Sequence, residues 1–481
     1  MIHLFERGSA SRRALLWLAV FAFIGIGLIL LYRDAEQQDS GYHFLFARWA
    51  WQHPHYFVSV WARPLFTFLY SFPSQLGYSA AKIFTLAICL VTAWQTFRLA
   101  QQLKFERAEL AVPLLFLQPS FFLLCSVVLT EPLFALLLVI ALRLHMSGRA
   151  RIGMLIASLL ILVRPEGFFI GVLWGLWVLF DKRDKRPWWR RIPETLLLAT
   201  GIAIWWLAAF LITRDPFWIA HDWPPDWQPL GNIDGGGTIW KFVVLLPLIV
   251  GPLLLVPFVI GLNRSLKHRK FIIGTSAFLT LFFLHSLMYS RGWFGSAGYA
   301  RYFVCLSPVI ALITLTGWNR LADWQLKFFD TANKAYLVGI FGLSALVCLF
   351  YSDGWQFTRD ARAIEEMHNW FRANDRAVSR LICSQAYMRI SFDRDPLENP
   401  VFNNERIHNL ELLRQSPGPT LLFWEEDTGP KWYGMRAEDF ESAGYVRLKS
   451  QSFRLEGWFF RLPWNRFGGA RIQQMHLFYK E

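Results

Sequence analysis

Residues 34–48 read DAEQQDSGYHFLFAR, an acidic and polar stretch that begins where the first apolar span of the chain ends. That span covers Leu15–Tyr32, and three arginines precede it, namely Arg7, Arg12 and Arg13. Because cationic flanks tend to remain in the cytoplasm, the span is expected to deliver Asp34 and Asp39 to the opposite side. Carboxylates at a membrane boundary are costly unless they are hydrated or used, so this stretch is the first candidate for chemistry.

The composition indicates an α-helical polytopic membrane protein. Of the 481 residues, 54% are hydrophobic, and the chain contains 24 Trp and 44 Phe. Soluble proteins are usually nearer about 45–50% apolar and do not gather that content in repeated runs. The net charge of +14 is concentrated in short loops between the apolar runs. This positive-inside distribution argues against a nucleic-acid partner. The basic loops are 98–107, 149–151, 182–191, 264–270 and 320–334.

The apolar runs predict about eleven transmembrane helices in a cell inner membrane, with a cytoplasmic N-terminus. Their expected ranges are 14–32, 77–97, 109–127, 131–146, 152–163, 167–180, 192–212, 239–262, 271–289, 302–318 and 335–351. The first span is interpreted as a retained signal anchor, because no small-x-small cleavage site follows it. The spans on either side of Arg164-Pro165-Glu166-Gly167 are short for a bilayer, so this tip is expected within the membrane, lining a cavity.

A change in composition near Ser352 predicts two domains, a transmembrane domain (1–351, with the first outer loop at 33–75) and a soluble extracytoplasmic α/β domain (352–481). In the second domain, Ile364, Met367 and Phe371 recur at the spacing of an amphipathic helix. Short apolar runs follow at 381–383 and 420–424, with a helix expected at 437–443 and a strand at 445–448. The absence of a glycine-rich phosphate loop argues against a nucleotide site there.

Cysteine and histidine patterns give no sign of a disulfide framework or a metal cofactor. Four of the five cysteines fall inside apolar runs, and only Cys383 lies in a polar region. His43, His53 and His55 cluster in the first outer loop, but His53-Pro54-His55 lacks the spacing of metal ligands. No cofactor is therefore expected, and a divalent metal is not supported by ligand spacing.

Asp39 is the leading candidate for a general base. A carboxylate can deprotonate an acceptor hydroxyl when it lies within hydrogen-bond distance of that proton. The alternative is a solvated acid or the N-cap of a following helix, since Asp39-Ser40 precedes an apolar run. Asp34 lies closer to the end of the span and is a weaker candidate for the same role.

Four arginines fall at predicted outer membrane boundaries: Arg48, Arg63, Arg164 and Arg301. Each is either an interfacial anchor or one part of a phosphate site, because guanidinium groups bind phosphate oxygens with two parallel hydrogen bonds. Glu131 and Glu166 each lie beside a proline at a hairpin tip. They are either first-turn acids favoured by the helix dipole or buried functional acids.

Tryptophans are numerous, and most are expected to form the aromatic belts of a membrane protein. Trp218, Trp223 and Trp227 lie in the predicted outer loop 213–237. They could stack on a sugar ring, although the interfacial interpretation is favoured.

Several motifs occur in an order that resembles the GT-C glycosyltransferases. These polytopic enzymes use lipid-phosphate sugars and include protein O-mannosyltransferases and lipid A aminoarabinose transferases. The matching segments are Asp39-Ser40-Gly41-Tyr42 with Ala47-Arg48, Arg63-Pro64-Leu65, Thr130-Glu131-Pro132-Leu133, Arg164-Pro165-Glu166-Gly167 and Tyr299-Ala300-Arg301-Tyr302. The likeness spans roughly residues 15–320, and the C-terminal domain matches by position only. Family members often carry a second acid directly after the catalytic Asp, where this chain has Ser40, so the choice between Asp39 and Asp34 stays open.

The resemblance implies an inverting transfer of a mannose or another hexose from a polyprenyl-phosphate donor, outside the cytoplasm. Asp39, Asp34 or Glu131 would supply the catalytic acid. The substrate-binding residues would be Arg48, Arg63, Arg164, Glu166, Tyr299 and Arg301, with the arginines holding the donor phosphate. The acceptor would be a lipid, a glycan or a protein.

Two other classes of protein remain open at this level. One is a polysaccharide polymerase or ligase that acts on lipid-linked glycans, which must also bind a lipid phosphate. The other is a flippase or transporter of lipid-linked sugars. Transporters often show two-fold internal repeats with interrupted helices in matching halves, and no such repeat is visible here.

Overall fold

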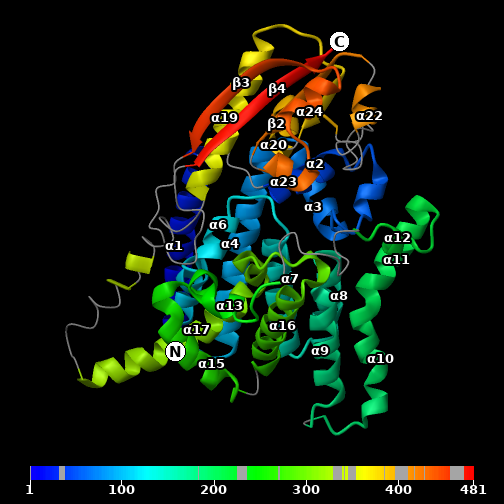
Figure 1. The fold of residues 1–481 in the computed structure, drawn as a ribbon. Helices are drawn as coiled ribbons and strands as arrows, with labels where there is room; N and C mark the ends of the chain where they lie inside the picture. Colours follow the sequence, from blue (N-terminus) through cyan, green and yellow to red (C-terminus); the bar gives the residue numbers. More distant parts are fainter. Residues whose placement is uncertain are drawn as a thin grey trace.

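The computed structural model describes most of the chain. The described residues are 2–31, 38–182, 184–224, 236–268, 271–328, 339–340, 342–344, 354–383, 385–395, 410–415, 418–426, 428–455 and 471–481. Figure 1 shows a helical part below and a small sheet with its own helices above.

The helical part runs from α1 to α17, with short 3₁₀ segments labelled η. Its elements are α1 (Ile2–Leu31), α2 (Gln38–Trp49), η1 (Pro54–Phe57), α3 (Pro64–Ser74), α4 (Tyr78–Gln102), η2 (Ala108–Leu110), α5 (Ala111–Phe116), α6 (Pro119–Leu124), α7 (Glu131–Met146), α8 (Ala150–Ser158), η3 (Leu159–Leu162), α9 (Gly167–Leu179), η4 (Trp188–Arg190), α10 (Ile192–Thr195), η5 (Leu196–Ala199), α11 (Thr200–Thr213), α12 (Trp218–His221), α13 (Lys241–Val244), α14 (Leu246–Val250), η7 (Pro252–Leu254), α15 (Leu255–Ser265), α16 (Ile272–Arg291), η8 (Trp293–Gly295), η9 (Ala300–Leu306) and α17 (Ser307–Phe328).

Within the described residues, five helices are long and apolar enough to cross a membrane. They are Ser9–Leu30, Tyr78–Gln102, Ile192–Thr213, Ile272–Arg291 and Ala300–Asp323. Three shorter apolar helices cover Ala150–Leu162, Gly167–Leu179 and Pro252–Ser265. The chain is therefore a multi-pass membrane protein, as expected, although the count of about eleven spans is not confirmed. Most of the expected eleventh span, 335–351, lies outside the described residues.

Two expected spans are interrupted in the structure. The run 109–127 divides into η2, α5 and α6, and α6 begins at Pro119 after an extended residue, Gln118. Proline cannot donate the backbone hydrogen bond that would continue a helix, so the break falls there. The run 239–262 is broken in the same way at Gly251-Pro252, where Gly251 has a φ of 104°. Positive φ is accessible to glycine at little cost.

Close helix packing in the lower part depends on small residues. A Cβ atom added to Gly261 on α15 would overlap the Ile313 carbonyl of α17, and one added to Gly317 on α17 would overlap the Pro257 carbonyl of α15. Without side chains at these two positions, the backbones of α15 and α17 approach each other directly. Such contacts are typical of helix pairs within membranes.

The C-terminal part is a four-stranded sheet covered by helices. The elements are α19 (Gly354–Arg372), β1 (Arg380–Cys383), α20 (Ala386–Phe392), α22 (Leu410–Arg414), β2 (Thr420–Glu425), α23 (Thr428–Tyr433), α24 (Ala437–Ser442), β3 (Val446–Leu455) and β4 (Arg471–Lys480). The strand order is β1-β2-β4-β3, with β1 parallel to β2 and the other pairs antiparallel. Ile364, Met367 and Phe371 of α19 are all buried, which confirms the expected amphipathic helix.

The first polar segment of the chain touches the C-terminal part. At the end of α2, Arg48 donates to Asp393 from Nε at 3.3 Å and from Nη2 at 3.0 Å. The Nε2 atom of His53 lies 2.6 Å from the Oδ2 atom of Asp395. The helix that carries Asp39 in its first turn is thus packed against residues that follow α20, more than 300 positions later in the sequence.

Candidate functional site

Five charged side chains from separate elements form one connected group, termed the ionic cluster: Asp39, Glu131, Arg164, Glu166 and Arg301. Asp39 lies in the first turn of α2 and Glu131 in the first turn of α7. The other three come from the segment between η3 and α9 and from η9. Five residues that the sequence singled out therefore meet in space.

Proline and glycine shape the backbone around this cluster. Pro132 and Pro64 stand in the first turns of α7 and α3, where a missing N–H does no harm. Gly167 begins α9, and a Cβ atom there would collide with the backbone of Leu160 and Ile161. The absence of a side chain lets the Arg164–Glu166 tip fold back onto η3, which directs Arg164 inward.

Arg164 is the centre of the cluster. Its Nη1 atom lies 2.9 Å from Oε1 of Glu131, and its Nη2 atom lies 2.8 Å from Oε1 of Glu166. The side chains of Arg164 and Glu131 are only 10% and 2% exposed. Burying such charges is costly unless they are paired and hydrogen-bonded, and here both conditions are met. Arg164 also donates to Thr130 Oγ1 at 3.2 Å.

Arg301 joins the cluster to the candidate base. It donates a hydrogen bond to Oδ2 of Asp39, and its Nε atom lies 3.9 Å from Oε1 of Glu131. The guanidinium also lies over the Tyr299 ring, 4.9 Å from its centroid. The Asp39 side chain is 43% exposed, whereas Arg301 is 17% exposed. Asp39 is therefore the most accessible acid of the cluster.

The electrostatic balance keeps Asp39 ionised. Burial raises the pKa of the carboxyl group, but the charge and hydrogen bond of Arg301 outweigh it, so the pKa is lowered overall. An ionised carboxylate is the form that a general base requires.

Arg63 lies beside the cluster at the start of α3. Burial and the neighbouring charge of Arg164 lower its pKa to about 10, while Glu166, Glu131 and Asp39 oppose that shift. Its φ of 69° is unusual for a residue other than glycine. Its Nη1 atom donates to the Val60 carbonyl at 2.9 Å.

His285 and Tyr302 complete the surroundings, and the sequence did not single out either as a site residue. His285 Nε2 lies 3.7 Å from Oε1 of Glu166, and its ring stacks on Tyr302 with centroids 5.1 Å apart. The Arg164 guanidinium lies 5.5 Å from the centroid of the Tyr302 ring. An ionisable residue inside an apolar run was the available signal for His285. Tyr302 gave no signal beyond its place after Arg301.

Some predicted residues lie elsewhere. Arg48 is engaged with Asp393 and with the Gln75 carbonyl at 2.9 Å. Its expected role in donor binding therefore has no support from the geometry. Asp34 lies outside the described residues. Trp227 does too, so neither position can be placed in the site.

Of the three histidines of the first outer segment, His53 and His55 lie side by side with ring centroids 6.0 Å apart, and no contact joins His43 to them in the described part of the chain. His43 stacks on Trp61 at a centroid distance of 4.7 Å, His53 meets Asp395, and His55 packs on Tyr56. Within the described part of the chain, no group of three His, Cys, Asp or Glu side chains is arranged to hold a metal ion.

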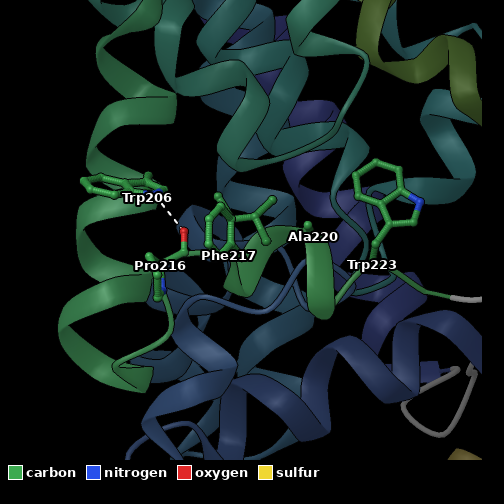
Figure 2. A pocket seen from close by; sticks show the side chains of 6 residues that line it. Trp206, Pro216, Phe217, Ala220 and Trp223 are labelled. Carbon is green, nitrogen blue, oxygen red and sulfur yellow. Dashed lines mark hydrogen bonds between the residues drawn. The ribbon is translucent and has the colours of Figure 1, made fainter.

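An apolar pocket lies apart from the ionic cluster. Figure 2 shows it beside α11 and α12, where the Trp206 indole donates to the Pro216 carbonyl at 2.9 Å. The pocket has a volume of about 590 Å³ and is lined by Trp206, Pro216, Phe217, Ile219, Ala220 and Trp223. None of these residues has an ionisable side chain, so the ionic cluster is the better candidate for chemistry.

Comparisons with known proteins identify the fold. No protein-family model and no curated protein sequence matches the chain. Among solved structures, ArnT from Cupriavidus metallidurans in the apo state matches with a TM-score of 0.59 and 11% identity, covering 96% of this chain and 98% of ArnT. ArnT bound to undecaprenyl phosphate matches with a TM-score of 0.57 and 12% identity over the same shares. The chain has the GT-C fold.

The GT-C assignment confirms the resemblance inferred from the motif order. It covers the helical part and the C-terminal sheet together, since nearly the whole of both chains is matched. At this identity the likeness is one of fold alone, and the chemistry of a GT-C protein must be argued from its own site.

Proposed function

We propose that the protein is an integral-membrane glycosyltransferase that transfers a sugar from a polyprenyl-phosphate donor to an acceptor on the extracytoplasmic side. The sugar would be a mannose or another hexose, and the acceptor a lipid, a glycan or a protein. The proposal rests on the contact of Asp39 with Arg301 in the ionic cluster, which contains three acids and two arginines. The fold supports it, because ArnT with the same fold was solved with undecaprenyl phosphate bound.

Asp39 is proposed as the general base. It is ionised and partly exposed, and it lies at the accessible end of a cluster whose other acids are covered. In the transfer, an acceptor oxygen attacks the anomeric carbon while its proton passes to Asp39. The bond between the anomeric carbon and the phosphate oxygen breaks, and polyprenyl phosphate leaves with inversion at the sugar.

The arginines are proposed to hold the donor phosphate. Arg301, Arg164 and Arg63 all lie at or beside the cluster, and guanidinium groups bind phosphate oxygens through paired hydrogen bonds. Negative charge grows on the phosphate as the bond to the sugar breaks, and fixed positive charges near it stabilise that change. Glu131 and Glu166 keep the arginines oriented when no donor is bound.

A donor panel tests the proposal. The purified full-length chain in lipid nanodiscs is incubated with undecaprenyl-phosphate-linked hexoses and, separately, with undecaprenyl-pyrophosphate-linked oligosaccharides. Release of undecaprenyl phosphate from a hexose donor supports the proposal. Turnover of the pyrophosphate-linked oligosaccharides alone would replace it with a polymerase or ligase function. Movement of intact donor across the bilayer without bond cleavage would replace it with lipid-linked sugar transport.

A further inference from the structure

The loop Val58–Arg63 is hydrogen-bonded to side chains of α11 and α12 and of Asp222, which follows α12. The Trp205 and Trp218 indoles donate to the Val58 carbonyl at 2.9 and 3.3 Å. Two residues further on, the Val60 N–H donates to Oδ2 of Asp222 at 2.6 Å. Three side chains from a segment about 150 positions away therefore hold a single short loop.

The backbone of Val60 links Asp222 to Arg63. The Val60 N–H is held by Asp222, while the Val60 carbonyl accepts a hydrogen bond from Nη1 of Arg63. The Arg63 N–H donates to the Ser59 carbonyl at 3.1 Å, which closes the loop. Val58 and Val60 are essentially inaccessible. Asp222 and the Arg63 guanidinium therefore bind the same residue, Val60, through its N–H and its carbonyl.

The supporting segment is itself well ordered by local contacts. Figure 2 shows the turn between α11 and α12, which is closed by the bond from Trp206 to Pro216. Asp215 accepts from the Phe217 N–H at 2.8 Å in the same turn. Val58, Val60, Leu162, Trp205 and Ala209 form one small apolar core, against which Trp218 and Trp223 pack. Since Leu162 precedes Arg164 by two residues, this core also supports the tip that carries the centre of the ionic cluster.

Arg63 needs such support because its backbone is strained. A φ of 69° is unfavourable for a residue other than glycine and persists only where the surroundings determine it. We propose that Asp222 is a positioning residue for Arg63, holding the Val58–Arg63 loop so that the guanidinium is presented to the donor phosphate. The inference rests on the proposed function only in taking that phosphate as the ligand of Arg63.

Two substitutions at position 222 separate positioning from charge. Asp222→Ala removes the acceptor for the Val60 N–H, whereas Asp222→Asn retains one acceptor oxygen for it and loses the charge. Binding of undecaprenyl phosphate to the purified full-length chain is measured by native mass spectrometry. Asp222→Ala is expected to weaken binding about tenfold, and Asp222→Asn by no more than about twofold.

A double variant tests whether the effect passes through Arg63. If Asp222 acts only on Arg63, Arg63→Ala/Asp222→Ala binds no more weakly than Arg63→Ala, because the guanidinium is already gone. Additive losses would overturn the inference, and so would unchanged binding in Asp222→Ala when Arg63→Ala binds weakly.

A measurement made without lipid tests the role of Asp222 independently of the proposed function. Phenylglyoxal modification of Arg63, followed by mass spectrometry, reports how firmly its guanidinium is held. The rate is expected to rise in Asp222→Ala and to stay unchanged in Asp222→Asn. Arg389, which is 2% exposed and lies on α20, reports unfolding in the same sample. If Arg389 also becomes reactive, Asp222→Glu, which moves the acceptor by one methylene, replaces the alanine variant.

These measurements distinguish failure of the proposed function from failure of the positioning role of Asp222. If the wild-type chain binds no undecaprenyl phosphate, the proposed function fails, and the modification rates still decide whether Asp222 positions Arg63. If the wild-type chain binds the lipid but Arg63 reacts equally in wild type, Asp222→Ala and Asp222→Glu, the positioning role is excluded.

Discussion

Glu131 and Arg164 form an ion pair at 2.9 Å in which neither side chain is more than 10% exposed. The pair joins α7 to the tip between η3 and α9, and it places one acid between two arginines. The Glu131 Oε1 atom also lies 3.9 Å from Nε of Arg301. Because of this shared acid, a change at any one of the three residues alters the setting of the other two.

Removing Glu131 should destabilise the fold. Glu131→Gln leaves the buried Arg164 with Glu166 as its remaining carboxylate partner in the cluster, and breaking a buried pair typically costs about 3 kcal/mol or more. The free energy of unfolding in mixed micelles measures the effect. Glu411→Gln is the matched control, since Glu411 and Arg414 form an exposed pair that should contribute less than about 1 kcal/mol. Equal, small decreases in the free energy of unfolding in both variants would show that the buried pair stabilises the fold no more than the exposed pair.

Asp39 should be needed for turnover but not for folding. Asp39→Asn keeps the shape and removes the basic oxygen, so turnover should fall by about a hundredfold or more. Turnover is measured with a donor that the panel identifies, alongside expression and the thermal unfolding midpoint. A fully active Asp39→Asn with an inactive Asp34→Asn would assign the role to Asp34. If both variants keep full activity, neither residue is the base.

Arg301 should resist replacement by lysine. An ammonium keeps the charge but loses the planar fork that can bind Asp39 and a phosphate together. Arg301→Lys is therefore expected to impair use of the donor more than use of the acceptor. Steady-state kinetics with each substrate varied separately will show this. An interfacial anchor would instead tolerate lysine, so an unchanged donor KM and kcat would remove Arg301 from the site.

His43 should make the protein sensitive to acid. Burial, aided by the charge of Arg63, lowers the pKa of His43 from its ordinary value of 6.5 to about 3. In the unfolded chain the ring takes up a proton near pH 6.5, whereas in the folded chain it does so only near pH 3. Stability is therefore lost as the pH falls from about 6.5 towards 3, by about 2 kcal/mol at pH 5. His43→Phe should lose less stability than wild type between about pH 7.5 and pH 5, as measured by unfolding in micelles. A parallel loss in the two proteins would contradict this assignment.

The orientation of the chain can be tested with cysteine labelling. Ser442 lies in the C-terminal part, which the distribution of basic loops predicts to be outside the cytoplasm, and Ser147 precedes the basic loop 149–151. A membrane-impermeant thiol reagent should label Ser442→Cys in intact cells and Ser147→Cys only after permeabilisation. Cys89, Cys125, Cys305 and Cys383 are buried and should remain silent, and Cys348, which lies outside the described residues, is replaced by serine in both variants. The reverse pattern would invert the proposed topology.

The sequence predicted the parts of the fold that depend on local patterns. Long apolar runs became helices, and the spacing of Ile364, Met367 and Phe371 gave α19. The strand β4 was missed because buried Leu477, Phe478 and Tyr479 are consecutive, so they lack the alternation of a half-buried strand. The interruptions at Pro119 and Gly251 were also missed, since hydropathy averaged over a window conceals a single break.

The sequence indicated which residues belong to the candidate site better than it indicated how they are arranged. Asp39, Glu131, Arg164, Glu166 and Arg301 stood out because charge at a membrane boundary requires an explanation. Nothing in the sequence indicated that Arg48 would turn to Asp393, because that partner comes 345 positions later. Asp222 was hidden for a similar reason, since its role depends on a backbone N–H and not on a motif.

The contact between α2 and the residues after α20 also bears on how the protein is made. Arg48 meets Asp393 across 345 positions of sequence. A ribosome that adds about 5–20 residues per second would therefore need about 20–70 seconds to supply the second partner after the first. During synthesis, the helix that begins with Asp39 waits at the membrane without its final neighbour. A nascent chain shorter than about 400 residues should consequently lack the partner of Arg48, and the end of α2 should stay open to proteases and chaperones until the C-terminal part has been made.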